Sequence, residues 1–119
     1  MYLAGGESFI KTAHKELQEK VFSQGCLALI TPTLSTPYVP ADYDATHDGE
    51  VFMTFPWNLL FAYPIVAVPA SLSEKNVPVG VQVIGNTYQD LDAFRVAMGL
   101  SKVLPQLYKE DRFPTFTRK

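Results

Sequence analysis

Two histidines, one cysteine and an acidic segment are the residues of this chain whose chemistry could support catalysis or metal binding. Nucleophilic catalysis needs a serine or cysteine within hydrogen-bond reach of a base that a third group orients. Cys26 opens an apolar run that predicts a buried strand, and a buried free cysteine usually packs as a small hydrophobe. His14 lies among lysines in a helical pattern, where we expect a packed or solvated role. These residues do not predict a nucleophilic site.

The acidic segment 42–50 places four carboxylates close to His47, which suggests a metal site. In an EF-hand loop, however, ligands alternate along the chain, with a glycine at the sixth position and a glutamate at the twelfth. Here Gly49 is the eighth residue counted from Asp42, and the fifth residue is not a ligand. We therefore interpret the segment as a solvated acidic loop and expect no metal. A small hydrolase that uses His47 with a loop carboxylate is an alternative interpretation.

Composition and charge exclude several classes of function. The chain has 119 residues, with 10 Lys and Arg against 12 Asp and Glu, so no basic excess indicates nucleic acid as a partner. Prolines interrupt the longest apolar stretch before it reaches the roughly 18 residues of a membrane helix, so we expect no membrane contact. Gly80 and Gly85 lack the following lysine of a phosphate-binding loop and indicate close backbone approach or a turn. A single cysteine and no secretory signal pattern predict a reduced, cytoplasmic protein.

Apolar periodicity and turn residues predict three helices and three strands. Ser8 is the expected N-cap of the first helix, and Gly25 is its expected stop. Asp90 is expected to cap the last helix. The predicted elements are a helix at 8–24, a strand at 26–31, a short helix at 55–62, strands at 64–69 and 79–84, and a helix from 90 that Pro105 ends.

These elements predict a single α/β unit over residues 1–119, with a mixed sheet of about three strands and flanking helices. A polar loop separates the strands at 64–69 and 79–84, which favours an antiparallel hairpin. The strand at 26–31 is an unbroken apolar run, so we expect it to be buried. The last helix carries apolar residues over a broad face and is expected to be buried on much of its girth.

Taken together, several segments of the chain resemble the C-terminal part of the amidase signature family. The most specific of them is Val77–Gly85, where the family typically has Leu-Pro-Val-Gly-Leu-Gln followed by an apolar strand. The resemblance implies a partial amidase-signature fold. It also implies hydrolysis of an amide C–N bond, or ammonia release from a glutamine side chain, by a Ser–Ser–Lys triad. The other segments that carry it are Leu29–Thr33, Thr54–Asn58 and Pro64–Ala70, with Asp90 and Ala97 beyond.

The same resemblance implies which parts of the site this chain holds. In the family, the catalytic lysine and both serines lie in the N-terminal and central parts of the fold, which include a glycine- and serine-rich loop. Gly5–Ser8 lacks the serine pair of that loop, so no catalytic residue is assigned here. The family's C-terminal segment helps to build the substrate-side wall, which makes Thr54, Trp57 and Asn58 our candidate substrate-pocket residues.

We therefore expect the C-terminal segment of an amidase-signature hydrolase, inactive alone and without a cofactor. Hydrophobic residues make up 47% of the chain and charged residues only 18%, which predicts apolar surface that needs a cover. That cover is expected to be either the missing N-terminal amidase portion or a second copy in a homo-oligomer. The alternative is a freestanding, non-catalytic α/β interaction module derived from an amidase tail, which predicts a cooperative, monomeric fold.

Overall fold

The computed structural model describes residues 2–44, 51–60 and 62–108, and side chains from residue 5 onward. Within these residues, no helix has the length and apolar character that crossing a bilayer requires. The elements are α1 (Tyr2–Lys20), a 3-10 turn η1 (Phe22–Gln24), β1 (Ala28–Pro32), α2 (Phe55–Leu60), β2 (Ile65–Leu72), β3 (Pro78–Gly85) and α3 (Asp90–Val103).

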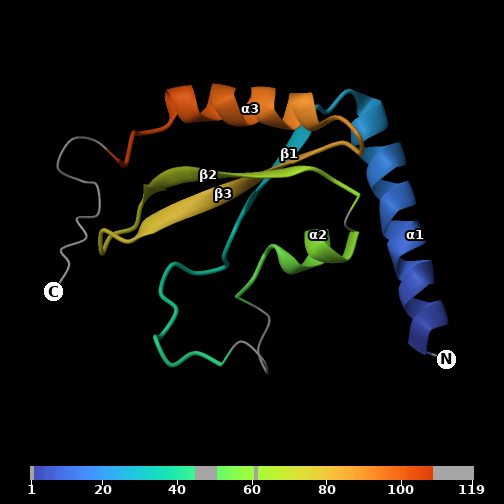
Figure 1. The fold of residues 1–119 in the computed structure, drawn as a ribbon, viewed down its shortest axis with the longest axis horizontal. Helices are drawn as coiled ribbons and strands as arrows, with labels where there is room; N and C mark the ends of the chain where they lie inside the picture. Colours follow the sequence, from blue (N-terminus) through green and yellow to red (C-terminus); the bar gives the residue numbers. More distant parts are fainter. Residues whose placement is uncertain (1, 45–50, 61, 109–119) are drawn as a thin grey trace, which may run out of the picture.

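The three strands form an open sheet in the order β1-β3-β2 (Figure 1). β3 pairs antiparallel with both neighbours, so that Gln82 lies between Thr31 of β1 and Ala67 of β2. The α/β class, the three strands with flanking helices and the β2–β3 hairpin are confirmed. The expectation of a mixed sheet is wrong, because β3 returns between β1 and β2 and so separates the two strands that run in the same direction.

The core consists of two clusters, one on each face of the sheet. Successive strand residues point to opposite faces, so the neighbours Val83 and Ile84, both 0% exposed, belong to different clusters. Val83 packs with Val68 and Ala97 under α3, which lies along the sheet at the top of Figure 1. Ile84 packs on the other side, with the buried residues Phe22, Leu60 and Tyr63 and with partly buried side chains of α1 and α2.

The first helix is longer than the sequence predicts. α1 begins at Tyr2, so Ser8 lies inside the helix and is not its N-cap. Gly5 and Gly6 do not end the helix, because glycine can adopt helical dihedrals at a cost of only about 1 kcal/mol each relative to alanine. The helix also ends earlier than predicted, at Lys20. Gly25 ends the 3-10 turn η1 instead: its φ is 89°, and its N–H donates to the carbonyl of Phe22, the first residue of η1.

Charged pairs one turn apart cover the exposed side of α1. Glu16 contacts Lys20, and this hydrogen bond and its negative charge raise the pKa of the lysine above its usual 10.5. Both side chains are at least half exposed, so the pair contributes little to stability.

The first strand is more exposed than predicted. β1 has a paired neighbour on one side only among the described residues, and α3 covers mainly β2 and β3. As a result Leu27 is 60% and Ile30 51% exposed, and Cys26 is exposed as well. The prediction of a buried strand with a buried cysteine is therefore wrong, because an apolar run cannot by itself indicate whether a second layer covers it.

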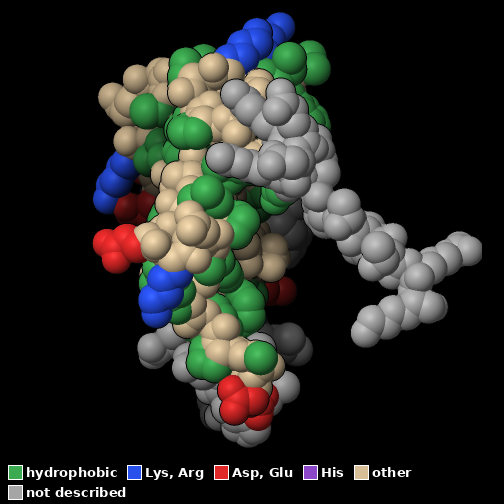
Figure 2. All heavy atoms as spheres, turned by 90° about the vertical axis from the view of Figure 1, so that its left-hand side faces the viewer, with side chains coloured by type: hydrophobic (Ala, Val, Ile, Leu, Met, Phe, Trp, Pro, Cys, Tyr) green, Lys and Arg blue, Asp and Glu red, His purple; other side chains and the backbone are tan. Residues whose placement is uncertain are grey.

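The last helix also departs from its prediction. α3 buries Ala93 and Ala97 against the sheet, while Leu91, Phe94 and Met98 face solvent, so the helix is not buried on much of its girth. Its N-cap position belongs to Gln89, and Asp90 is the first helical residue. Figure 2 shows that hydrophobic side chains also reach the surface over much of the side that carries the β2–β3 turn.

Gly85 is required where α3 crosses the end of β3. A Cβ at this position would lie 2.8 Å from the Cβ of Ala93 and 3.2 Å from the Cγ of Pro64. This confirms that Gly85 marks close backbone approach.

We predict that Gly85→Ala lowers the free energy of unfolding by about 1–3 kcal/mol, because the helix must move away from the strand. Gly99→Ala is the matched control: Gly99 lies within α3 with open space around its Cβ position. It should raise stability by about 0.5–1 kcal/mol through helix propensity. Urea denaturation measures both changes, and a Gly85→Ala chain as stable as the unchanged one would contradict the close contact.

Candidate functional site

Gln82 is a buried polar residue in the middle of the sheet, only 1% exposed. Its Nε2 donates one hydrogen bond to the carbonyl of Pro32 at 3.1 Å and another to the carbonyl of Met53 at 2.9 Å. Because both partners are acceptors only, they fix which end of the amide faces them. One side chain on β3 thereby joins the end of β1 to the segment that leads into α2.

Backbone pairing strengthens this junction around Thr33. The Met53 N–H donates to the Thr33 carbonyl at 3.1 Å, and the Ser35 N–H donates to the Val51 carbonyl at 2.9 Å. On its other side, Thr33 donates to the Gly80 carbonyl from its backbone N–H at 3.3 Å and from its Oγ1 at 3.1 Å. The chain after β1 is therefore held between β3 and the entry to α2.

The candidate pocket residues Thr54, Trp57 and Asn58 lie immediately after this junction. The Thr54 carbonyl accepts a hydrogen bond from the Asn58 N–H at 3.0 Å, which closes the first turn of α2. Thr54 and Trp57 are half-buried, and Asn58 is exposed. The Trp57 ring meets Tyr63 edge-on at 6.2 Å between centroids, so it packs against the core cluster. A substrate role for these three residues stays a prediction.

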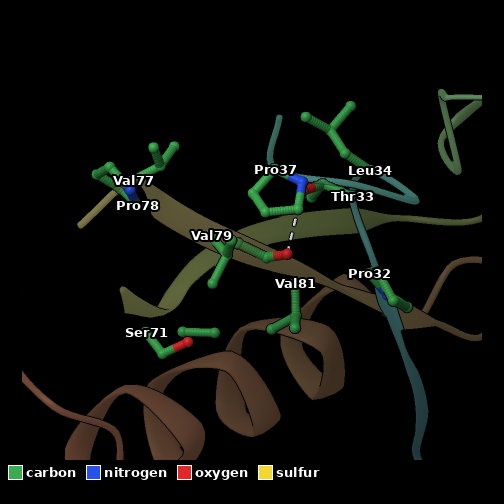
Figure 3. A pocket seen from close by; sticks show the side chains of 11 residues that line it. Pro32, Thr33, Leu34, Pro37, Ser71, Val77, Pro78, Val79 and Val81 are labelled. Carbon is green, nitrogen blue, oxygen red and sulfur yellow. Dashed lines mark hydrogen bonds between the residues drawn. The ribbon is translucent and has the colours of Figure 1, made fainter. Parts of the chain in front are cut away.

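A separate apolar pocket of about 430 Å³ lies where Thr33 meets Gly80 of β3 (Figure 3). Its walls come from the end of β1, the loop that follows, and the hairpin end of β2 and β3. The hydrogen bond from the Thr33 hydroxyl to the Gly80 carbonyl joins two of these walls. None of the described residues that line it is charged. None of the three candidate residues of α2 lines it either. The lining residues are mostly proline and valine: Pro32, Thr33, Leu34, Pro37, Ala70, Ser71, Val77, Pro78, Val79, Gly80 and Val81.

A polar network ties α1 to the end of β3. The buried Tyr63 hydroxyl lies 2.8 Å from His14 Nδ1 and accepts a hydrogen bond from Gln18 Nε2 at 3.3 Å. The same Gln18 nitrogen donates to Asn86 Oδ1 at 2.7 Å. Of the packed and solvated roles expected for His14, the structure shows the packed one, while Tyr63, Gln18 and Asn86 were not identified from the sequence. The available signal was a polar-tipped aromatic, Tyr63, directly before a predicted strand.

The described residues contain no assembled catalytic group. No described lysine is hydrogen-bonded to a serine hydroxyl, and no three side chains of His, Cys, Asp or Glu gather there as metal ligands would. Cys26 is exposed and free. The alternative site at His47, with most of the acidic loop, lies outside the described residues.

Comparison with known proteins finds relatives among the A subunits of glutamyl-tRNA(Gln) amidotransferase. The protein from Brucella anthropi is 31% identical over 100 residues, which cover 78% of this chain and 20% of the relative. The protein from an Exiguobacterium species is 34% identical over 107 residues, covering 82% of this chain and 22% of the relative. In Roseobacter denitrificans the identity is 29% over 110 residues, with coverage of 87% and 22%.

The chain is homologous to the C-terminal part of this amidase-signature subunit. The resemblance that the sequence motifs indicate is thereby confirmed. The chain spans about a fifth of the length of the curated amidotransferase subunits that it matches. No protein-family model matches it, and no solved structure matches it.

Gln82→Met tests the junction between β1, β3 and the α2 entry. We predict a loss of about 2 kcal/mol in unfolding free energy, because the carbonyls of Pro32 and Met53 both lose their donor from the buried Gln82 side chain. Trp57 is the chain's single tryptophan, so a shift of its emission maximum reports displacement of α2. Gln106→Met, at an exposed position, is the matched control and should change neither quantity. Equal effects of the two variants would contradict the role of Gln82.

Tyr63→Phe tests the α1 network separately. The phenylalanine keeps the ring stacked on Phe22 but loses the hydroxyl bonds to His14 and Gln18. We expect thermal unfolding to show a loss of about 1 kcal/mol. Tyr88 is 91% exposed, so Tyr88→Phe should stay within about 0.5 kcal/mol of the unchanged chain. A Tyr63→Phe chain of unchanged stability would contradict a contribution of the Tyr63 hydroxyl to holding α1.

Proposed function

We propose that this chain is the C-terminal segment of an amidase-signature enzyme, inactive alone, and that it forms part of the substrate-side wall of an amide-cleaving site. The Ser–Ser–Lys triad is supplied by the preceding part of the fold. The reaction is hydrolysis of an amide C–N bond, or release of ammonia from a glutamine side chain as in amidotransferases, and it takes place in the cytoplasm. Homology to the amidotransferase subunits is the observation that carries this proposal.

The open edges of the sheet support this proposal. Among the described residues, β1 and β2 each pair on one side only, and an open edge offers unpaired N–H and C=O groups to another strand. Apolar side chains lie exposed along these edges, at Leu27, Ile30 and Ile65. A sheet that continues into the preceding part of an amidase would pair these groups and cover these side chains.

The hydrogen-bonded junction at Gln82 supports a positioning role. A wall that contacts substrate must hold its shape while the substrate binds, and sites are more precise on fixed elements than on free loops. Gln82 holds the start of α2 through the Met53 carbonyl, directly before Thr54. We therefore assign Thr54, Trp57 and Asn58 to the substrate side of the wall and Gln82 to the positioning of that wall.

A chimera tests this function. The chain replaces the corresponding segment of the Brucella anthropi protein, and ammonia release from glutamine is measured with the amidotransferase's other components present. We expect activity in the chimera, none in a Brucella protein truncated before this segment and none in the chain alone. The chimera carrying Gln82→Met should lose activity at least about tenfold, whereas Gln106→Met should not.

The possible failures lead to different conclusions. Amide hydrolysis by the isolated chain, above a mock-purified control, would contradict its inactivity. A chimera that melts cooperatively like the native Brucella protein but releases no ammonia would contradict the proposed role. If the isolated chain is also a cooperative monomer, the freestanding interaction module becomes the better explanation.

A further inference from the structure

The outer face of α3 carries an apolar stripe without a partner among the described residues. Leu91, Phe94 and Met98 are 70%, 55% and 59% exposed. Their spacing of three and four residues places them on one side of the helix, away from Ala93 and Ala97, which face the sheet. Figure 1 shows α3 at the edge of the molecule, with its outer side turned away from the sheet.

The charges on α3 are separated along its length. Asp90 lies at its first position and Lys102 lies near its last, about 18 Å apart at 1.5 Å per residue. Neither forms an ion pair among the described residues, whereas Asp92 and Arg95 already pair with each other at 3.0 Å. Tyr88, just before the helix, has a left-handed backbone with φ of 60°. Its side chain is 91% exposed, so a large aromatic ring is accessible at the acidic end of the helix.

We propose that the outer face of α3 binds the same face of a second copy of this chain, with the two helices antiparallel. In that arrangement Phe94 of each copy lies at the level of Met98 of the other, which favours sulfur–aromatic contact. Tyr88 and Asp90 of each copy lie at the level of Lys102 of the other, and both a ring and a carboxylate attract an ammonium group. A parallel pair would bring like charges together instead.

In the antiparallel pair the two helix dipoles also point in opposite directions, which is favourable. Such a two-fold interface uses one surface twice, which is the commonest form of homodimer. α3 has only 14 residues, so its outer face buries less than a standard interface. The dimer is therefore weak and reversible, with a Kd of roughly 10 μM. This interface faces away from the sheet and does not depend on amide chemistry.

Sedimentation equilibrium of the purified chain tests the dimer. We expect a monomer–dimer equilibrium that Phe94→Ser and Met98→Ser each weaken at least about tenfold. Val103→Ser is the matched control, because Val103 is 80% exposed on another side of the same helix. It should leave the Kd within about twofold. Circular dichroism and melting of each variant confirm that the chain remains folded.

Charge reversal tests the orientation without removing apolar groups. Asp90→Lys and Lys102→Asp should each weaken the homodimer about threefold, and an equimolar mixture of the two variants should recover the original affinity as a heterodimer. In a Cys26→Ser background, a chain with Leu91→Cys should cross-link to one with Ser101→Cys more readily than either does to itself.

Three results would overturn the proposal. A chain that stays monomeric to about 500 μM would show that α3 has another occupant or none. A dimer that resists both serine substitutions would lie elsewhere, for example at the open sheet edges. Preferential self-cross-linking of each cysteine variant would establish a parallel pair.

Discussion

The side-chain amide of Gln82 is the interaction on which the arrangement of this chain depends. Two carbonyls from separate segments share its nitrogen, so β1, β3 and the entry to α2 are held by one buried group. Its Oε1 has no protein partner within the described structure, and neither has Oγ1 of Thr31, its neighbour across the sheet. Burying unpaired polar atoms is costly, so the two hydrogen bonds that the Gln82 nitrogen makes are opposed by the cost of its unpaired oxygen.

The second constraint is the amount of apolar surface. Two small clusters form on opposite faces of the sheet, and Val83 and Ile84 occupy their centres. Within the described residues, the strands and helices leave part of the apolar surface uncovered: Leu27 and Ile30 are exposed at one edge, and the stripe on α3 is exposed on the outside. The proposals for the enzyme and for the dimer concern different parts of this uncovered surface, and the two are compatible.

The elements with strong local signals could be predicted closely from the sequence. The β2–β3 hairpin, the left-handed turn at Gly25 and the close approach at Gly85 follow from turn chemistry and from the absence of a Cβ, which act within a few residues. The helix start at Tyr2 and the cap at Gln89 were missed, because backbone continuity and packing override a favourable capping side chain. The motif around Gln82 indicated the homology but not the partners of its amide, which are 29 and 50 residues away.

By itself, the sequence determined the order of the elements, the apolar excess and the relationship to amidotransferase subunits. These properties are recorded in local patterns and motifs. Only the tertiary structure decided which strand lies in the middle of the sheet, which face of α3 is left open, and which groups Gln82 and Tyr63 contact. The physical reason is that burial and hydrogen bonding depend on what other segments of the chain lie opposite a residue, and an apolar residue has the same sequence signal whether or not it is covered.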